Sequence, residues 1–398
     1  MIGETAGRFT AERFAAPAAV DRLRSRALLA GGAGILLAAV GFLLDRPAFF
    51  RAWLVGWLYW LGIALGCLAI MMLHHMTRGA WGLVARRLLE AAARTVPLLA
   101  LLFLPLLFGL RELYSWARPE AAADHLLQLK AAYLNVPFFV ARAALYCLIW
   151  GGFAFLLSGL SRRQDETGDL RLTRRMQLVA APGIVLYCLA ASFASVDWLM
   201  SLQPHWFSTI YGVYFLGGQG LSALAFLIVV AFFFARREPL GDVLSSGHFH
   251  DWGKLLLAFV MLWTYFSFSQ FLIVWAGNLP EEVTWYLART RHGWQWVALA
   301  LVLFHFALPF VLLLSRDLKR RPRRLALVAG WMLVMRWVDL VWQVQPAFGG
   351  GRFAFSWLYL VTPVAVGGLW LAAWAGELKK RPLLPIRDPW LPEAVAHD

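Results

Sequence analysis

The amino-acid sequence predicts an all-α polytopic membrane protein in which ten transmembrane helices form two four-helix bundles (spans 2–5 and 6–9) plus two flanking helices. The first observation is composition: of 398 residues, 61% are hydrophobic and only 15% are charged, whereas soluble domains carry roughly a quarter charged residues. The second is that long apolar runs recur ten times. The third is a sequence repeat four runs apart, which assigns the runs to two bundles.

The ten runs have the length that helices need to cross the hydrocarbon of a bilayer, roughly 20 residues. Backbone polar groups in lipid must be paired within the segment, and the sequence lacks the ten-residue alternating pattern of a membrane barrel, so each run is predicted to be a helix. The predicted spans are residues 27–44, 52–73, 91–110, 135–158, 176–201, 207–234, 251–275, 294–315, 325–345 and 354–375.

The first run is expected to be retained rather than cleaved. Residues 1–26 carry five arginines and form a leader that is long for a signal peptide, and no small-residue cleavage site follows the run. We therefore divide the chain into an amino-terminal segment (1–26), a ten-helix transmembrane domain (27–375) and a carboxyl-terminal tail (376–398).

Lys and Arg are distributed unequally between the two sides that ten crossings define. The termini and the loops after even-numbered spans hold 25 of them, and the remaining loops hold 8. Because cytoplasmic loops carry the excess of basic residues, both termini are predicted to be cytoplasmic. The same bias accounts for the net charge of +14, and nucleic-acid binding is not expected because no recognised basic motif accompanies the charge.

Several kinds of centre are not expected. Cys67, Cys147 and Cys188 stand alone within apolar runs, without the spacings of zinc, disulfide or haem c sites. Only His305 is clearly mid-span, so paired histidines for a haem are missing, as are glycine-rich phosphate loops and nucleophile triads. A chain without a redox centre must take its driving force from an ion gradient or from neighbouring subunits.

A polar motif ends the fifth span and is echoed at the end of the ninth. In both copies an aspartate, Asp197 or Asp339, lies seven residues before the proline of a Gln-Pro turn, and Phe-Ser-x-x-Tyr follows, at 207–211 and 355–359. Because spans five and nine are four helices apart, the two four-helix units are predicted to be parallel repeats about an axis along the membrane normal.

Ionisable side chains inside spans form an outer set of functional candidates, because a charge at mid-bilayer costs about 2.5–3.5 kcal/mol on insertion scales. Arg336 and Asp339 share a helical face, so one interpretation is an ion pair that only neutralises itself. Asp197 has no cation three or four residues away: either Arg142 or Arg336 reaches it from another helix, or it takes up a proton. Proton exchange is therefore favoured at Asp197 over Asp339. The outer set is Asp197, His305, Arg336 and Asp339.

An inner set lies at the opposite ends of the helices. His248 and His250 are two residues apart and would not share a helical face, and no further ligands accompany them, so a metal site is not expected. One alternative is a helix start with Asp251 as cap or first-turn anion; another is a point where protons enter, since His titrates near neutral pH. The inner set is His74, His75, His250, Asp251 and Lys254.

Two motifs carry a resemblance to a known family. They are Val196-Asp197-Trp198 with Pro204-His205-Trp206-Phe207-Ser208-Thr209-Ile210-Tyr211-Gly212, and His248-Phe249-His250-Asp251-Trp252-Gly253-Lys254 with Trp275 and Asn278-Leu279-Pro280-Glu281-Glu282. Over essentially all ten spans the sequence resembles the F subunits of bacterial alternative complex III, a quinol:cytochrome c (or other high-potential acceptor) oxidoreductase. The wider family is the polysulfide reductase membrane subunit (NrfD-like) group, whose core is two four-helix bundles.

The resemblance implies a respiratory-chain subunit of the bacterial inner membrane without its own redox centre. Partner subunits would carry iron–sulfur clusters and haem c, and a sister ten-helix subunit would hold the quinol site. The partners expected are membrane lipid, that sister subunit, the iron–sulfur subunit, c-type cytochrome subunits and a terminal oxidase. The implied activity is proton conduction coupled to quinol oxidation, with the outer set and the inner set as two half-channels.

Three alternatives remain open at the level of sequence. The chain itself could bind quinone or menaquinone and oxidise quinol, and the first place to look is near Asp197, at His205, Trp206 and Arg142. It could be a free-standing ion-coupled transporter, although its mid-span prolines lie on unmatched helices whereas carriers break corresponding helices. It could also be a scaffold whose buried charges serve only packing.

Overall fold

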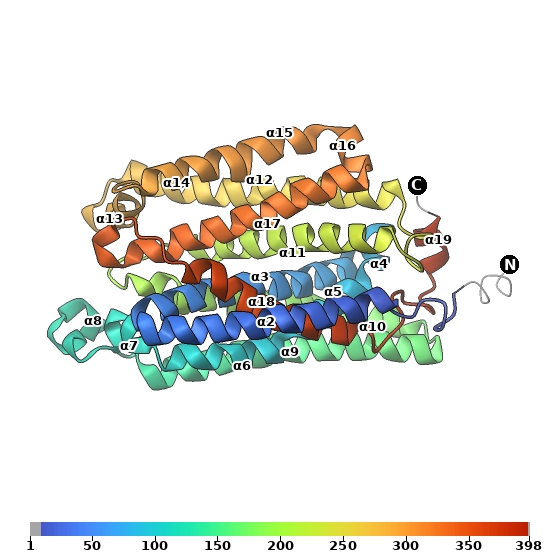
Figure 1. The fold of residues 1–398 in the computed structure, drawn as a ribbon, viewed down its shortest axis with the longest axis horizontal. Helices are drawn as coiled ribbons and strands as arrows, with labels where there is room; N and C mark the ends of the chain where they lie inside the picture. The colour runs from blue at the N-terminus through green and yellow to red at the C-terminus, as the bar shows by residue number, and fades with distance from the viewer. Residues whose placement is uncertain (1–8, 397–398) are drawn as a thin grey trace.

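The computed structural model describes residues 9–396, and residues 1–8 and 397–398 of the two predicted end segments lie outside the described part. In Figure 1 the long helices run side by side, the first and last described residues lie at one end of the molecule, and α8 (His125–Leu129) and α13 (Pro280–Arg289) lie at the other. We call these the terminal end and the α13 end. The structure contains ten helices that are long and apolar enough to cross a membrane and no strand in residues 9–396, which confirms the predicted fold class.

The ten spans consist of single helices or of short helices in line. The spans in chain order are α2 (Ala18–Leu44), α3 (Arg46–Thr77), α5 and α6 (Arg86–Ala93 and Val96–Leu107), α9 (Val136–Thr167), α10 (Arg171–Trp198) with η3 (Met200–Leu202), α11 (Tyr211–Ala235), α12 (Ser246–Gly277), α14, η4 and α15 (Trp294–Ala300, Leu301–Ala307 and Leu308–Leu314), α17 (Pro322–Val344) with η5 (Gln345–Ala347), and α18 (Leu358–Leu378).

Packing between these helices gives the two predicted bundles. In the first bundle α3 packs on α5, α6 and α10, and α9 packs on α10 and α6. In the second bundle α11 packs on α12 and α17, while α12 contacts α15 and α17 contacts η4. The flanking helices α2 and α18 lie along each other and against α3.

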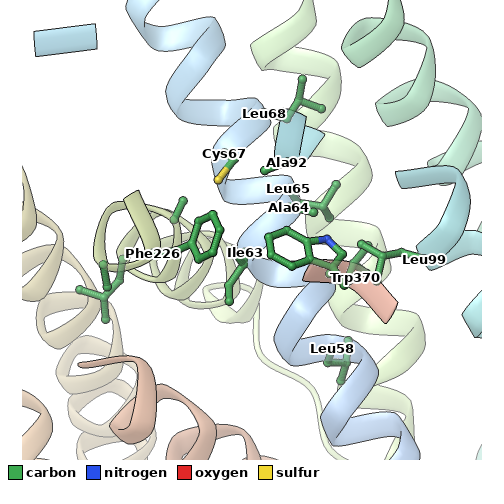
Figure 2. Close-up of a cluster of buried hydrophobic side chains, with 14 of the residues drawn as sticks. Leu58, Ile63, Ala64, Leu65, Cys67, Leu68, Ala92, Leu99, Phe226 and Trp370 are labelled. Atoms are coloured by element: carbon green, nitrogen blue, oxygen red, sulfur yellow. The ribbon is translucent and has the colours of Figure 1, made fainter. Parts of the chain in front are cut away.

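The seam between the bundles is formed mainly by α3 and α11. These are the most buried spans: 83% and 78% of the residues in their most apolar 18-residue stretches are buried inside the protein. At Gly66 a Cβ atom would lie 2.1 Å from the carbonyl oxygen of Gln219, so glycine lets the two backbones approach, as small residues do at membrane helix contacts. Figure 2 shows side chains of α3, α11 and α18 meeting beside this seam, where Phe226 and Trp370 pack edge to face at 5.1 Å between ring centroids.

Several helices extend beyond the apolar runs that predict them. α2 begins at Ala18, so the predicted amino-terminal segment (1–26) includes its first turns. The third span begins at Arg86 instead of residue 91 because α5 carries charged residues that are buried by neighbouring helices. Hydropathy marks only the apolar part of a helix, so helical turns whose polar groups are paired inside the protein are missed.

Candidate functional site

The two copies of the repeat have the same local structure. Each aspartate lies near the carboxyl end of its helix, at the α13 end, and each helix finishes in a 3₁₀ turn, η3 or η5. In both copies the N–H of the motif tyrosine donates to the carbonyl of the motif serine, at 3.4 Å for Tyr211 and 3.0 Å for Tyr359. Asp197 and Asp339 are both 0% exposed, so neither carboxylate faces lipid.

Asp197 is held by a cation from the neighbouring helix α9. The Nε and Nη2 atoms of Arg142 donate to the two carboxylate oxygens at 2.9 and 2.8 Å, and the Tyr146 hydroxyl donates to Oδ2 at 2.7 Å. Arg142 also donates to the carbonyl of Tyr133 and stacks on its ring at 3.8 Å. Of the alternatives left open by the sequence, the structure therefore selects Arg142 as the partner of Asp197.

Asp339 is held by groups from three helices. The Tyr214 hydroxyl of α11 donates to Oδ1 at 2.8 Å, and the indole N–H of Trp263 on α12 donates to Oδ2 at 3.2 Å. Arg336 donates to the same Oδ2 through one N–H, so this guanidinium makes one bond to the carboxylate instead of two. The predicted Arg336–Asp339 pair is thus present, and Gln343 extends it by donating to the Tyr214 hydroxyl at 3.3 Å.

His305 lies beside the Asp339 cluster, in the π-helical turn η4. Its ring is fully buried and stacks on Trp263 with 4.0 Å between centroids. Neither ring nitrogen has a hydrogen-bond partner in the described chain. Trp263 therefore contacts the carboxylate of Asp339 on one side and the imidazole of His305 on the other. The π-helical turn that carries His305 is also of a kind that is frequent at functional sites.

Arg289, at the end of α13, is a buried cation that the sequence analysis missed. It is 1% exposed, stacks on Trp285 at 3.7 Å, and donates to Gln203 Oε1 at 2.8 Å and to the Gln343 carbonyl at 2.6 Å. Within residues 9–396 no carboxylate oxygen lies within 4.0 Å of its guanidinium. Burial lowers the pKa of Arg289 to about 9, which leaves it cationic at neutral pH. The spacing of Trp285 and Arg289, one helical turn apart, is the only local signal for this contact.

The structure divides the inner set into two places. His74 and His75 line a cavity of about 190 Å³ at the terminal end, together with Arg86 and Asp388, which form an ion pair at 2.8 Å. His74 Nδ1 and His75 Nε2 have no partner in the described part of the chain. The other members, at the start of α12, do not line this cavity; there Lys254 pairs with Asp251 at 2.6 Å, and His250 is half-buried.

The start of α12 differs from the predicted helix start. The helix begins at Ser246 with Ser245 as its cap, and His248 completes the capping box. His248 is fully buried, and its Nε2 lies 2.9 Å from the Ala394 carbonyl of the carboxyl-terminal helix α19 (Leu391–Val395). Asp251 is therefore neither the cap nor a first-turn anion, because five residues of the helix precede it.

A network of buried ion pairs, also missed from the sequence, fills the terminal end of the first bundle. Arg87 of α5 pairs with Glu90 and Asp165, and Arg381 also reaches Glu90 at 3.4 Å. Arg94 pairs with Glu377 of α18 at 2.6 Å. All of these residues except Arg94 fell in predicted loops or in the predicted carboxyl-terminal tail, whereas Arg94 fell inside the predicted third span (91–110). The i, i+3 spacing of Arg87 and Glu90 is the signal that could have indicated a helix there.

The three residues proposed as neighbours of a quinone have separate contacts. His205 lies in an exposed loop with its Nε2 2.7 Å from Asp124 Oδ2. Trp206 is buried, stacks on Trp285 and donates to the Glu282 carbonyl at 3.1 Å. Arg142 is engaged by Asp197, and none of the three lines the large cavity described below.

These observations define a class of protein: a ten-helix membrane protein with buried ion pairs at both ends of its bundles. Among residues 9–396 no three His, Cys, Asp or Glu side chains are grouped so that they could hold a metal ion. No protein-family model and no curated protein sequence matches the chain. The comparisons therefore identify no family.

Proposed function

We propose that this chain is the proton-conducting membrane subunit of a quinol:cytochrome c oxidoreductase complex, in a bacterial inner membrane with both termini in the cytoplasm. The observation that carries the proposal is the Asp339–Trp263–His305 cluster: the indole of Trp263 donates to the buried carboxylate of Asp339 and stacks on the buried imidazole of His305, whose nitrogens have no hydrogen-bond partner within residues 9–396. Intramembrane ionisable groups of this kind mark proton relays. The assignment to a quinol oxidoreductase rests on the sequence resemblance alone.

The geometry favours Asp339 over Asp197 as the proton-exchanging carboxylate, which reverses the ranking expected from the sequence. Both oxygens of Asp197 accept from Arg142, and Tyr146 donates as well, so protonation would break a bidentate ion pair. Asp339 has a single bond from its arginine, and His305 can accept or release a proton nearby. We assign Asp197 a structural role and Asp339 with His305 the outer half of the path.

The inner half of the path is assigned to the terminal end of the first bundle. His74 and His75 face the cavity of about 190 Å³ with unpartnered nitrogens, and cavities of this size with polar walls hold ordered water. Between the two halves, the Tyr187 hydroxyl of α10 donates to Gln219 of α11 at the seam, and the Gln219 amide nitrogen has no partner in the described residues. We assign this pair as the polar step between the two halves.

The test uses the complex that purifies with the tagged chain from native membranes, reconstituted into liposomes. For Asp339→Asn we expect quinol oxidation to continue while the protons moved per electron fall, because the amide cannot exchange a proton. Asp242→Asn, at an exposed loop position, is the control and should change neither quantity.

Three outcomes would overturn the proposal. If no quinol oxidoreductase activity purifies with the chain, the assignment to that complex is wrong. If quinol oxidation itself stops and bound quinone is lost in Asp339→Asn, the chain is a catalytic quinol-binding subunit. If neither turnover nor proton movement changes, the buried charges serve packing.

A further inference from the structure

A second, much larger cavity lies in the second bundle towards the α13 end. Its volume is about 720 Å³, and α12, α13, α14 and η4 form its walls. The deep wall consists of side chains that are almost fully buried, Tyr214, Trp263 and Trp342. The rim consists of side chains that are more than half exposed, such as Tyr265 and Val302. The cavity therefore opens on one flank of the bundle, between α12 and η4.

The length of the cavity matches one leaflet of a bilayer. On α12 its lining extends from Met261 to Phe271, and the ten steps between these residues rise about 15 Å along a helix. The hydrocarbon core of a bilayer is about 30 Å thick, so the cavity covers about half of it. Because α12 begins at the terminal end and Met261 is at its middle, the cavity lies in the leaflet of the α13 end.

The flank on which the cavity opens consists of the two least buried spans. In α12 and in α14–α15 only 22% of the residues in the apolar stretch are buried inside the protein. Most side chains of these two spans therefore face the bilayer. The walls of this cavity are mainly apolar, so water finds few polar partners in it. A hydrocarbon chain from the adjacent leaflet needs no hydrogen-bond partners, and it gains van der Waals contacts with the aromatic wall.

We propose that this cavity binds one acyl chain of a membrane phospholipid, which enters sideways between α12 and η4. This inference goes beyond the proton path and does not depend on it. Charge at the α13 end favours a phospholipid over a neutral lipid: Thr290 lines the cavity there, and the next residue, Arg291, is exposed. No ion pair joins Arg291 to a carboxylate in residues 9–396, which leaves its guanidinium for a lipid phosphate.

The bound chain would lie directly against the Asp339 cluster. Tyr214 and Trp263 both line the cavity and both donate hydrogen bonds to Asp339. The chain would therefore pack these two donors and exclude water from this side of the carboxylate. In this way a lipid of one leaflet contacts the groups that hold the buried charge.

The test is photo-crosslinking in native membrane vesicles that contain a phosphatidylglycerol with a diazirine near the end of one acyl chain. We expect labelled peptides to include the deep wall at Trp263 and Trp342, which bulk lipid cannot reach. Val302→Trp, at the rim, should reduce deep-wall labelling at least fivefold. Val311→Trp is the matched control: it is on the same span and similarly exposed, 64% against 58%, but it does not line the cavity.

Arg291→Gln provides a second arm. It should lower the labelling by phosphatidylglycerol relative to a phosphatidylcholine probe, because the neutral side chain no longer attracts the net negative head group. Labelling confined to exposed side chains of α12 and η4, or equal labelling in the two Trp variants, would overturn the proposal. It is also overturned if an excess of a polyisoprenoid, but not of unlabelled phosphatidylglycerol, removes the deep-wall labelling.

Discussion

The buried carboxylates of the two bundles occupy matching positions and have different surroundings. Asp197 receives a bidentate cation from another helix, whereas Asp339 receives one N–H from Arg336 on its own helix and is completed by an indole and a phenol. Within residues 9–396 no histidine stacks on or bonds to the groups that hold Asp197, while the ring of His305 stacks on the indole that donates to Asp339. The comparison teaches that the two copies of the motif share a buried acid and its turn, and that the neighbouring helices determine what the acid can do.

The two clusters also differ in their charge balance. In the first bundle one arginine faces one aspartate, so the buried charge is neutral. In the second bundle Arg289 adds a buried cation held by neutral oxygens, the side chain of Gln203 and the carbonyl of Gln343. The second cluster thus combines two arginines with one aspartate and places a histidine, which can pass a proton to or from the carboxylate, beside it.

The largest effect that separates the clusters is expected from removing Arg142. Arg142→Gln leaves Asp197 buried without its cation, and breaking a buried pair in this way costs about 3–5 kcal/mol. Arg336→Gln should cost less, because Tyr214 and Trp263 still donate to Asp339. Thermal unfolding in detergent measures the loss of stability in both variants. Arg162→Gln is the control: its ion pair with Glu166 is exposed, so the loss of stability should be near zero. Equal losses at Arg142 and Arg336 would remove the distinction between the two clusters.

The next effect concerns the space around Arg336. A Cβ atom on Gly218 would lie 2.4 Å from the Arg336 Cζ, so Gly218→Ala forces the guanidinium away from Asp339 and should cost about 1–3 kcal/mol, as overpacking does. Gly152→Ala on α9 is the matched control, since a Cβ there meets nothing within 4 Å and alanine favours a helix over glycine. If both substitutions leave the melting temperature unchanged or raised, Arg336 is not confined as described.

A smaller effect on stability but a clear one on function is expected at His305. His305→Phe keeps an aromatic ring against Trp263 and removes both unpartnered nitrogens, so stability should change by less than about 1.5 kcal/mol. Proton movement per electron in the reconstituted complex should fall to the value of Asp339→Asn. If His305→Phe conducts protons normally, His305 is a packing residue and the two clusters differ less than we propose.

The smallest effect is expected outside the membrane, next to the first copy of the turn. Although desolvation acts in the opposite direction, hydrogen bonds from the Leu127 N–H and from His205 lower the pKa of Asp124. A carboxyl whose pKa is lowered on folding contributes stability that is lost as the pH falls below its unfolded value, roughly 3.9. Because intrinsic amide exchange slows as the pH falls, the quantity to measure is the protection of α8 relative to an unfolded peptide: it should decrease between pH 4 and pH 3, and Asp124→Asn should remove that dependence. Unchanged exchange in both forms would show that Asp124 does not hold this segment.

The sequence was sufficient for features that depend on one helix or one turn. Ten apolar runs predicted ten spans because each crosses hydrocarbon independently, and the repeated Asp-to-Pro spacing predicted two buried acids at equal depth. The Arg336–Asp339 pair was also predicted, since both residues lie on one helical face. The start of α12 was placed wrongly because hydropathy detects the apolar turns, whereas the Ser245 cap lies in polar sequence before them.

The tertiary structure alone decided which partners meet. Arg142 and Asp197 are 55 residues apart, and their contact depends on how α9 and α10 are rotated against each other. Burial of Arg289, the ion-pair network of Arg87, Glu90 and Arg381, and the cavity beside Trp263 likewise arise where separate helices pack. The periodicity of a sequence indicates which face of a helix is buried. Which side chains of a neighbouring helix meet that face depends on how the two helices cross and rotate, and the sequence of one helix does not specify this.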